Sequence, residues 1–350
     1  MARLSVWLPP FSPDYSGAAS AFFDLNAVTA MHDASGCTGN YTGFDEPRWY
    51  GSAAAIYCSG LREMDVIMGD DEKLIVKMLK AGEDLKPDVY AVIGSPVPMV
   101  AGCDLRGIAR ELESRSGVVS VGIDTTGTAY YDRGLYMACA ALLRRFGEPG
   151  PTRGGSVGIL GASPMDFGEG ENLRGLCRLL EENGFDIVGS VAMNYGLNVL
   201  RDAPKAQVNL AVSRAGYLIS EYMRGEYGQP YLAGLPVGAE GAREYLAVLK
   251  NVMKSGESAI IKGERPSQRP GGVLVIGEQI QSNAIRRALN LGYGTEDVTV
   301  GALYGLEKTL AAEGDVDLPD ERSIREEINS DRYGAVIADP FLYPLLRGEG

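Results

Sequence analysis

The stretch VYAVIGSPVPMVAGCDLRGIAREL, residues 89–112, contains a strand pattern, a turn and a helix pattern in that order. Its first five residues, Val89 to Ile93, are all apolar, as in a strand that is buried on both faces. Glycine and proline mark the turn that follows. One face of a helix comes next, formed by Leu105, Ile108, Ala109 and Leu112. A buried strand that leads into an amphipathic helix is the repeating unit of parallel α/β sheets.

The same unit recurs along the chain. Other strands are predicted at residues 27–30, 66–68, 118–123, 156–160, 187–191, 208–212, 273–276, 298–303 and 335–338. This alternation predicts an α/β fold of three Rossmann-like αβα domains with mainly parallel sheets. Segments 147–155 and 263–272 are rich in proline and glycine, as linkers are. We therefore expect domains at residues 1–150, 151–268 and 269–350, with the first as the one that binds a cofactor.

Charge and composition exclude several classes of partner. The 350 residues carry 33 basic and 46 acidic side chains, a net charge of −13. Because no Lys/Arg stripe forms, we expect neither nucleic acid nor an anionic membrane as a partner. No apolar run approaches the roughly 18 residues that a membrane-spanning helix needs. The five cysteines form no Cys-x-x-Cys pair and no dense disulfide framework, which favours a cytoplasmic location.

Three cysteines are candidate ligands because of their places beside predicted strands and helices. Cys37 lies in the glycine-flanked loop HDASGCTGNY, residues 32–41. Free backbone N–H groups there favour a thiolate for metal binding or nucleophilic attack, and the alternative is a small half-buried residue in a tight turn. Cys58 lies in a polar, glycine-rich segment. Cys103 precedes the helix at Leu105, where a reactive thiol and a buried cysteine are equally open alternatives.

Other polar and sulfur-bearing residues have simpler interpretations. Asp70 or Asp71 is expected to cap the helix that follows. Cys139 and Cys177 lie on apolar helical faces, so we expect them in the core. His32 is the only histidine, which excludes a His-rich zinc site within one chain. The chain has no GxxxxGK[S/T] motif, so no P-loop is expected.

Several segments together resemble the nitrogenase component 1 type oxidoreductases. In the first domain they are PPFSPDYSGAASAFFDL (9–25), VTAMHDASGC (28–37), SGLREMDVIMGDDEKL (59–74), PDVYAVIGSPVPMVAGCDL (87–105) and GIDTTGTAYYDRGLYMACAALL (122–143). The resemblance continues through GILGASPMDFGEGENLRGLCRLLEENGFDIV (158–188), VNLAVSRAGYLISEYMRGEYGQPYLAGLPVG (208–238), GGVLVIGEQIQSNAIRRALNLGYG (271–294) and VIADPFLYPLL (336–346). It therefore covers nearly the whole chain and implies the nitrogenase component 1 fold.

The resemblance implies one matched ligand for an iron–sulfur cluster. Cys37 corresponds to the family's cysteine in the loop after the first strand. The family's first cluster cysteine falls between Ser12 and Gly17, and its third falls near Pro96, so neither is matched. Cys58 and Cys103 are nearby thiols that the resemblance does not assign. By the resemblance, the cysteine that holds the large nitrogenase cofactor falls near Ser213, and the histidine that holds the same cofactor has no counterpart in this chain. We therefore expect no iron–molybdenum cofactor and no dinitrogen reduction.

The implied function is that of an electron-transferring reductase component. Clusters of this family lie between homologous chains, so a homodimer or a homologous second subunit is expected, with Cys37 and Cys58 supplied twice to a 4Fe–4S cluster. A separate ATP-hydrolysing iron protein would deliver the electrons, in keeping with the missing P-loop. An unknown small substrate would occupy a cleft lined by residues such as His32, Ser213, Arg214 and Tyr217.

Two alternatives stay open at this point. The first is a scaffold or carrier without catalytic activity for a metallocluster or a tetrapyrrole precursor, because assembly proteins of the family keep the fold. The second is a small-molecule binding protein that has lost the cluster and retains Cys37 as a relic. Substrate turnover with an iron protein separates the reductase from the scaffold, and absence of iron–sulfur absorbance would favour the binding protein.

Overall fold

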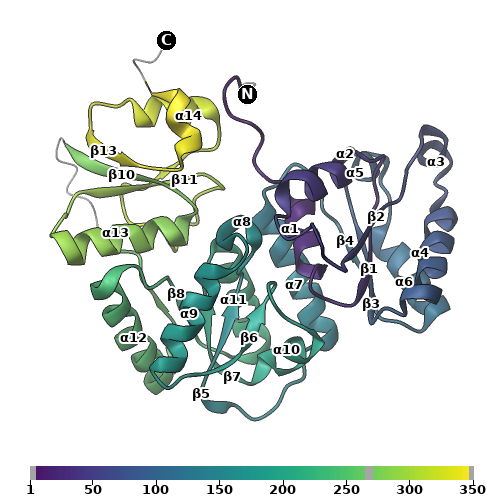
Figure 1. Cartoon of the computed structure of the whole chain (residues 1–350), viewed down its shortest axis with the longest axis horizontal. Helices are drawn as coiled ribbons and strands as arrows, with labels where there is room; N and C mark the ends of the chain where they lie inside the picture. The colour runs from purple at the N-terminus through teal and green to yellow at the C-terminus, as the bar shows by residue number, and fades with distance from the viewer. Residues whose placement is uncertain (1–4, 265–270, 347–350) are drawn as a thin grey trace. The chain divides into compact units, whose positions relative to one another are not determined.

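The computed structural model describes residues 5–264 and 271–346. The first of its sheets has the strand order β2-β1-β3-β4 with parallel pairs (Figure 1). Met31 pairs with Cys58 on one side and with Ile93 on the other. The carboxyl ends of three strands therefore meet at one edge, which we call the strand-end edge. The strands are β1 (Ala27–Met31), β2 (Ala55–Cys58), β3 (Val89–Ile93) and β4 (Ser120–Ile123).

Helices α4 (Asp71–Leu85) and α6 (Leu105–Ser116) flank this sheet because each presents one apolar face to it. Leu74 and Met78 of α4 and Leu105 and Leu112 of α6 are buried in one core with strands β1 and β3. Burying a leucine side chain of this kind stabilises the fold by about 1.5–3 kcal/mol. No helix in the described residues is long and apolar enough to cross a membrane. The helices are α1 (Asp14–Phe22), α2 (Gly36–Asn40), the π-helix η1 (Tyr41–Asp45), α3 (Glu63–Met68), α4 (Asp71–Leu85), α5 (Pro96–Ala101), α6 (Leu105–Ser116) and α7 (Tyr131–Phe146).

Two glycines allow α1 and α7 to pack backbone against backbone. A Cβ atom on Gly17 would lie 1.8 Å from the carbonyl oxygen of Tyr131, and one on Gly134 would lie 1.7 Å from the carbonyl oxygen of Asp14. Such distances are far below van der Waals contact, so only glycine fits at either position. These two glycines therefore serve helix packing, whereas the glycines in the turns after the strands serve the turns themselves.

Two further sheets complete the α/β architecture within the described residues. The five-stranded sheet has the order β6-β5-β7-β8-β9, and the four-stranded one has the order β12-β11-β10-β13. Their strands are β5 (Arg153–Leu160), β6 (Asp186–Val191), β7 (Ala206–Ala211), β8 (Tyr231–Ala233), β9 (Ala259–Ile260), β10 (Gly272–Gly277), β11 (Val298–Ala302), β12 (Val316–Asp317) and β13 (Tyr333–Ile337). The remaining helices are α8 (Pro164–Phe167), α9 (Glu171–Glu182), α10 (Leu197–Asp202), η2 (Ala203–Lys205), α11 (Arg214–Tyr227), α12 (Gly238–Ser255), α13 (Gln279–Tyr293), α14 (Glu321–Ile328) and η3 (Pro340–Leu345). The predicted α/β fold with parallel sheets is confirmed.

Contacts between Cα atoms group the chain into two compact units. One comprises Ser12–Gln207 and Glu221–Gly228 and contains the first sheet with its strand-end edge. Among the described residues, the other comprises residues 5–11, Val208–Ser220, 229–264 and 271–346. The boundaries 1–150, 151–268 and 269–350 stay a prediction, and residues 265–270 of the second expected linker lie outside the described residues.

One predicted strand is wrong and several short strands were not predicted. Residues 66–68 belong to helix α3, where the Asp65 carboxylate accepts the backbone N–H of Arg62 at 3.0 Å and Gly69 ends the helix at φ 64°. Two of the three apolar side chains that suggested a strand, Ile67 and Met68, are exposed on this helix, and Val66 is half-buried. Strands β2, β8, β9 and β12 escaped prediction because each has at most four residues, too few for a clear periodicity.

Candidate functional site

Asp33 holds together the loops at the strand-end edge. It follows β1 by two residues and is buried, and its carboxylate accepts the backbone N–H groups of Ser35 at 3.0 Å and Thr38 at 3.2 Å. Its own N–H donates to the Ser59 hydroxyl at 3.0 Å, and its carbonyl accepts the Cys58 thiol at 3.3 Å. Asp33 therefore fixes the loop of Cys37 against the end of β2. The spacing Asp-x-Ser is the sequence signal for such a turn.

Cys37 is half-buried near the start of α2. Burial raises the pKa of its thiol, and the negative charge of Asp33 raises it further. Asp33 accepts the backbone N–H groups of Ser35 and Thr38 beside Cys37, so these groups are not free to stabilise a thiolate, and the ligand role of Cys37 stays a prediction. The Tyr15 hydroxyl forms a hydrogen bond with Cys37 that acts in the opposite direction and lowers the pKa of the thiol.

Cys58 lies close enough to Cys37 for its charge to raise the pKa of the Cys37 thiol. Its sulfur accepts the backbone N–H of Gly60 at 3.3 Å, and its side chain is half-buried. The two cysteines that the sequence proposes as metal ligands are therefore brought to the same part of the strand-end edge. Each is partly accessible, as a ligand shared with a second chain has to be.

The two positions to which the resemblance assigns further cluster cysteines, Ser12 to Gly17 and Pro96, carry no thiol. Ser12 and Ser16 donate from their hydroxyls to the Asp45 carboxylate at 2.8 Å and 2.6 Å, and Asn40 donates to the same carboxylate at 2.8 Å. Pro96 begins α5 and carries no ligating atom. Asp45 was not predicted from the sequence, because its partners come from segments up to 33 residues away.

Cys103 belongs to a different group of side chains. Its sulfur lies 3.6 Å from Oδ1 of Asp71, and one ligand atom from each of His32, Asp71 and Cys103 lies within 4.8 Å of the others. Burial raises the pKa of the Cys103 thiol to about 12, with the Asp71 charge adding to it. Asp70 is the N-cap of α4, since its carboxylate accepts the N–H of Lys73 at 3.3 Å.

The other residues expected at a substrate cleft have structural roles in the second compact unit. The Ser213 hydroxyl accepts the N–H of Gly216 at 3.2 Å at the start of α11. Arg214 donates its backbone N–H to Glu278 and a guanidinium N–H to the carbonyl of Tyr304. Tyr217 is buried in an apolar cluster. Their assignment to a cleft stays a prediction. Of the two core cysteines, Cys139 is buried as expected and Cys177 is half-buried.

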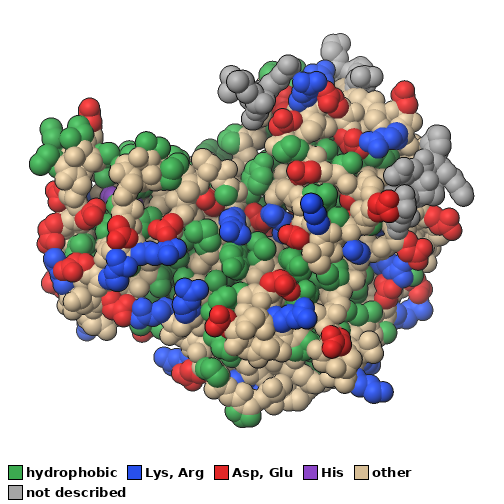
Figure 2. Space-filling model, turned by 180° about the vertical axis from the view of Figure 1, so that it is seen from behind, with side chains coloured by type: hydrophobic (Ala, Val, Ile, Leu, Met, Phe, Trp, Pro, Cys, Tyr) green, Lys and Arg blue, Asp and Glu red, His purple; other side chains and the backbone are tan. Residues whose placement is uncertain are grey.

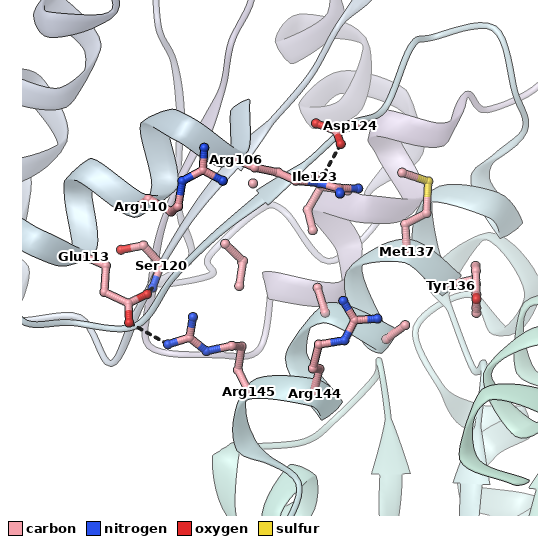
Figure 3. A pocket seen from close by; sticks show the side chains of 14 residues that line it. Arg106, Arg110, Glu113, Ser120, Ile123, Asp124, Tyr136, Met137, Arg144 and Arg145 are labelled. Carbon is pink, nitrogen blue, oxygen red and sulfur yellow. Dashed lines mark hydrogen bonds and ion pairs between the residues drawn. The ribbon is translucent and has the colours of Figure 1, made fainter. Parts of the chain in front are cut away.

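A pocket of about 420 Å³ lies between α6 and α7 and is lined by four arginines (Figure 3). Arg106 pairs with Asp124 at 2.7 Å and Arg145 pairs with Glu113 at 2.6 Å. Arg110 pairs with Asp104 at 3.1 Å. Three of the four guanidinium groups are thus balanced by carboxylates, so we assign no ligand to this pocket. It was not predicted from the sequence, because the arginines belong to two separate helices.

Large apolar side chains are exposed on helices that adjoin the strand-end edge. Figure 2 shows hydrophobic side chains gathered at the upper left of the view. Val100 of α5 is 80% exposed, and Met68 of α3 is 72% exposed. A monomer rarely exposes large contiguous apolar patches, which mark interaction sites. We call the exposed apolar side chains of η1, α3 and α5 the apolar edge surface. It comprises Phe44, Met64, Ile67, Met68, Val97, Met99 and Val100.

The chain is similar to known proteins along most of its length. A family model described as "Nitrogenase component 1 type Oxidoreductase" matches residues 13–273. The nitrogenase iron-molybdenum cofactor biosynthesis protein NifE of Clostridium pasteurianum is 24% identical over 363 residues, which cover 92% of this chain and 78% of that protein. A light-independent protochlorophyllide reductase subunit from Adiantum capillus-veneris is 24% identical over 196 residues, which cover 53% of this chain and only 38% of that protein.

Solved structures show the same fold. The structure titled "Nitrogenase Cp1 at pH 6.5" superposes with a TM-score of 0.73 at 14% identity and covers 99% of this chain and 85% of that one. A second, "Nitrogenase Cp1 at pH 5", has a TM-score of 0.65 at 16% identity and covers 95% of this chain and 71% of that one. Together with the family model, these likenesses confirm the resemblance seen in the sequence. The chain therefore belongs to the nitrogenase component 1 type oxidoreductases.

Proposed function

We propose that this chain is a nitrogenase-like reductase component that binds a 4Fe–4S cluster between two subunits and passes electrons to a small substrate. The observation that carries the proposal is that Asp33 joins two half-buried cysteines at the strand-end edge: its carbonyl accepts the Cys58 thiol, and its carboxylate accepts backbone N–H groups on both sides of Cys37. A 4Fe–4S cluster takes four thiolates. One chain brings two thiols to this place, and a second copy or a homologous subunit supplies the others.

The surroundings of the two thiols support a site between subunits. The apolar edge surface flanks the strand-end edge on α3, α5 and η1, and burying it against another chain would remove it from water. A cluster placed there would be screened from solvent by the same contact. The arrangement therefore favours a homodimer or a pair of homologous subunits over a monomer.

The residues around the thiols would hold and tune the cluster. When bound, such a cluster supplies one-electron transfer. Asp33 fixes the loop of Cys37 through two backbone N–H groups. Tyr15 forms a hydrogen bond with the Cys37 sulfur, and hydrogen bonds to cluster sulfurs are among the interactions that set reduction potential. Electrons would come from a separate ATP-hydrolysing iron protein of the same cytoplasmic compartment.

No iron–molybdenum cofactor is part of the proposal. The residue near the position of the cofactor cysteine, Ser213, is buried, and its hydroxyl accepts a backbone N–H at the start of α11. A serine in that role presents no thiolate to a metal cluster. The substrate is accordingly expected to be something other than dinitrogen.

Iron and sulfide analysis tests the cluster. Protein purified or reconstituted without oxygen is expected to contain about four iron and four sulfide per pair of chains. Cys37→Ala and Cys58→Ala are each expected to lose both elements, and Cys177→Ala, which changes a half-buried cysteine of α9, is the matched control. Full cluster retention in both Cys37→Ala and Cys58→Ala would refute the assignment.

A scaffold or carrier for a metallocluster or tetrapyrrole precursor is the second candidate function. It is favoured by the relative NifE, named as a cofactor biosynthesis protein, which matches 92% of this chain. Turnover of a substrate in the presence of an iron protein, ATP and reductant would establish the reductase. Transfer of one cluster or one precursor per site without turnover would establish the scaffold.

A further inference from the structure

A second set of ligand atoms lies at the strand-end edge, apart from the pair Cys37 and Cys58. His32 directly follows β1, Asp71 is the first residue of α4, and Cys103 follows α5. One ligand atom from each of the three lies within 4.8 Å of the other two. The three come from different elements, so the fold itself creates the group.

The imidazole of His32 is held in one orientation. The side chain is 5% exposed, and its Nδ1 lies 3.0 Å from the hydroxyl of Ser59. A hydrogen bond on one ring nitrogen is the usual way in which a protein orients a metal-binding histidine and leaves the other nitrogen for the metal. Burial lowers the pKa of His32, which keeps the ring neutral, the form that binds metals.

The Asp71 carboxylate is not needed to cap its helix. The adjacent Asp70 accepts the N–H of Lys73 and serves as the N-cap of α4. The Asp71 oxygen instead accepts the Cys103 thiol, with Oδ1 and Sγ 3.6 Å apart. In a tetrahedral zinc shell with Zn–S near 2.3 Å and Zn–O near 2.1 Å, these two donors are about 3.6 Å apart. The spacing of the pair therefore suits a shared cation.

We propose that His32, Asp71 and Cys103 form a mononuclear site for a divalent transition-metal ion of the zinc class. One nitrogen, one oxygen and one sulfur donor suit Zn²⁺ or Co²⁺ and disfavour Ca²⁺ and Mg²⁺, which take oxygen ligands. Binding replaces the thiol proton of Cys103, which passes to solvent, by the metal–sulfur bond. Three protein ligands leave a fourth position for water or a small ligand. The site is complete within one chain and does not depend on the proposed iron–sulfur cluster.

Titration with Co²⁺ alone tests this site in the full chain. A background of Cys37→Ala and Cys58→Ala removes the other pair of thiols at this edge. We expect one equivalent of Co²⁺ per chain, with thiolate-to-cobalt charge transfer and the intense visible bands of a four-coordinate ion. Acid-labile sulfide measured on the same samples separates this ion from any iron–sulfur cluster. Absence of binding, or a spectrum without a thiolate ligand, would overturn the proposal.

Substitutions identify the ligands. Because outer-shell partners of a metal already contribute about 10–100-fold to affinity, loss of a direct ligand is expected to weaken Co²⁺ binding at least about 100-fold. The variants are Asp71→Asn, Cys103→Ser and His32→Gln, and the matched controls are Asp70→Asn and Cys177→Ser. Circular dichroism checks that each variant folds. Asp71→Asn keeps the shape of the side chain, so its Co²⁺ affinity decides whether the site exists if another variant does not fold. Unchanged affinity in Asp71→Asn, or an equal loss in Asp70→Asn, contradicts the site.

Discussion

The two ligand groups at the strand-end edge differ in how much of a site one chain supplies. The pair Cys37 and Cys58 is half-buried and offers two sulfurs beside an apolar surface that is open to solvent. The group of His32, Asp71 and Cys103 offers three different donors within 4.8 Å of one another. Under the proposed function a second subunit completes the first group as a four-thiolate cluster site, whereas the proposed second site is complete within one chain. The two proposals therefore place a shared site and a self-contained site at the same edge of parallel strands.

The largest expected effects come from two substitutions, each of which should remove one of the two sites and leave the other intact. Cys37→Ala should abolish iron and sulfide binding and leave Co²⁺ affinity within about twofold, because Cys37 is no ligand of the second group. Asp71→Asn should weaken Co²⁺ binding at least about 100-fold and leave the iron and sulfide content unchanged. Metal analysis and Co²⁺ titration of both variants check this. Parallel losses in either variant would mean that the two groups act as one site.

The packing of α1 on α7 provides the next largest effect. Gly134→Ala forces a methyl group against the backbone of Asp14, next to Tyr15, and should destabilise the fold by about 3 kcal/mol. Urea denaturation measures the change. Gly175 lies in α9, where an added methyl group would meet no atom within 4 Å, so Gly175→Ala is the control and should stabilise by about 0.5–1 kcal/mol. Equal midpoints for the two variants would contradict the close packing.

A charge on the apolar edge surface should weaken association. Ile67 of α3 is 67% exposed, and Ile67→Lys would place an ammonium group in the expected interface. We expect subunit association to weaken about tenfold or more, at a cost above about 1.4 kcal/mol, without change in Co²⁺ affinity. Sedimentation under anaerobic conditions measures it. Leu85→Lys, at the far end of α4 and about 20 Å from its start, is the control.

The smallest effect concerns the hydrogen bond between Tyr15 and Cys37. This bond lowers the pKa of the Cys37 thiol against the larger effect of burial. Tyr15→Phe removes the donor, so the thiol pKa should rise and a smaller fraction should be thiolate at a given pH. The rate of alkylation of Cys37 in the cluster-free protein, followed against pH, should shift to higher pH. A shift to lower pH would reverse the role that we assign to Tyr15.

Much of the fold could be predicted from the sequence because its central strands are continuous apolar runs. Val89 to Ile93 is buried throughout, and the helix that follows places Leu105 and Leu112 in the core as its spacing indicates. The prediction failed at residues 66–68, where Ile67 and Met68 are exposed on α3. Exposed apolar side chains of this kind indicate an interaction surface. The periodicity of the sequence alone does not distinguish such a segment from a buried strand.

The candidate site was predicted only in part. Cys37 could be proposed from the sequence because a cysteine in a glycine-flanked loop after a strand is a local pattern. The roles of Asp33 and Asp71 depend on which strand ends and helix starts meet in space, and no local pattern contains that information. Asp71 was expected only as a possible cap of α4, yet Asp70 caps the helix and Asp71 contacts Cys103.

Native mass spectrometry of the anaerobically reconstituted protein tests the central claim most directly, because it counts chains and clusters in the same particle. We expect two chains, or one chain and a homologous partner, with a single 4Fe–4S cluster, and no cluster on the lone chain. Cys37→Ala should give particles without the cluster. A lone chain that carries an intact 4Fe–4S cluster, or a cluster retained in Cys37→Ala, would contradict the shared site.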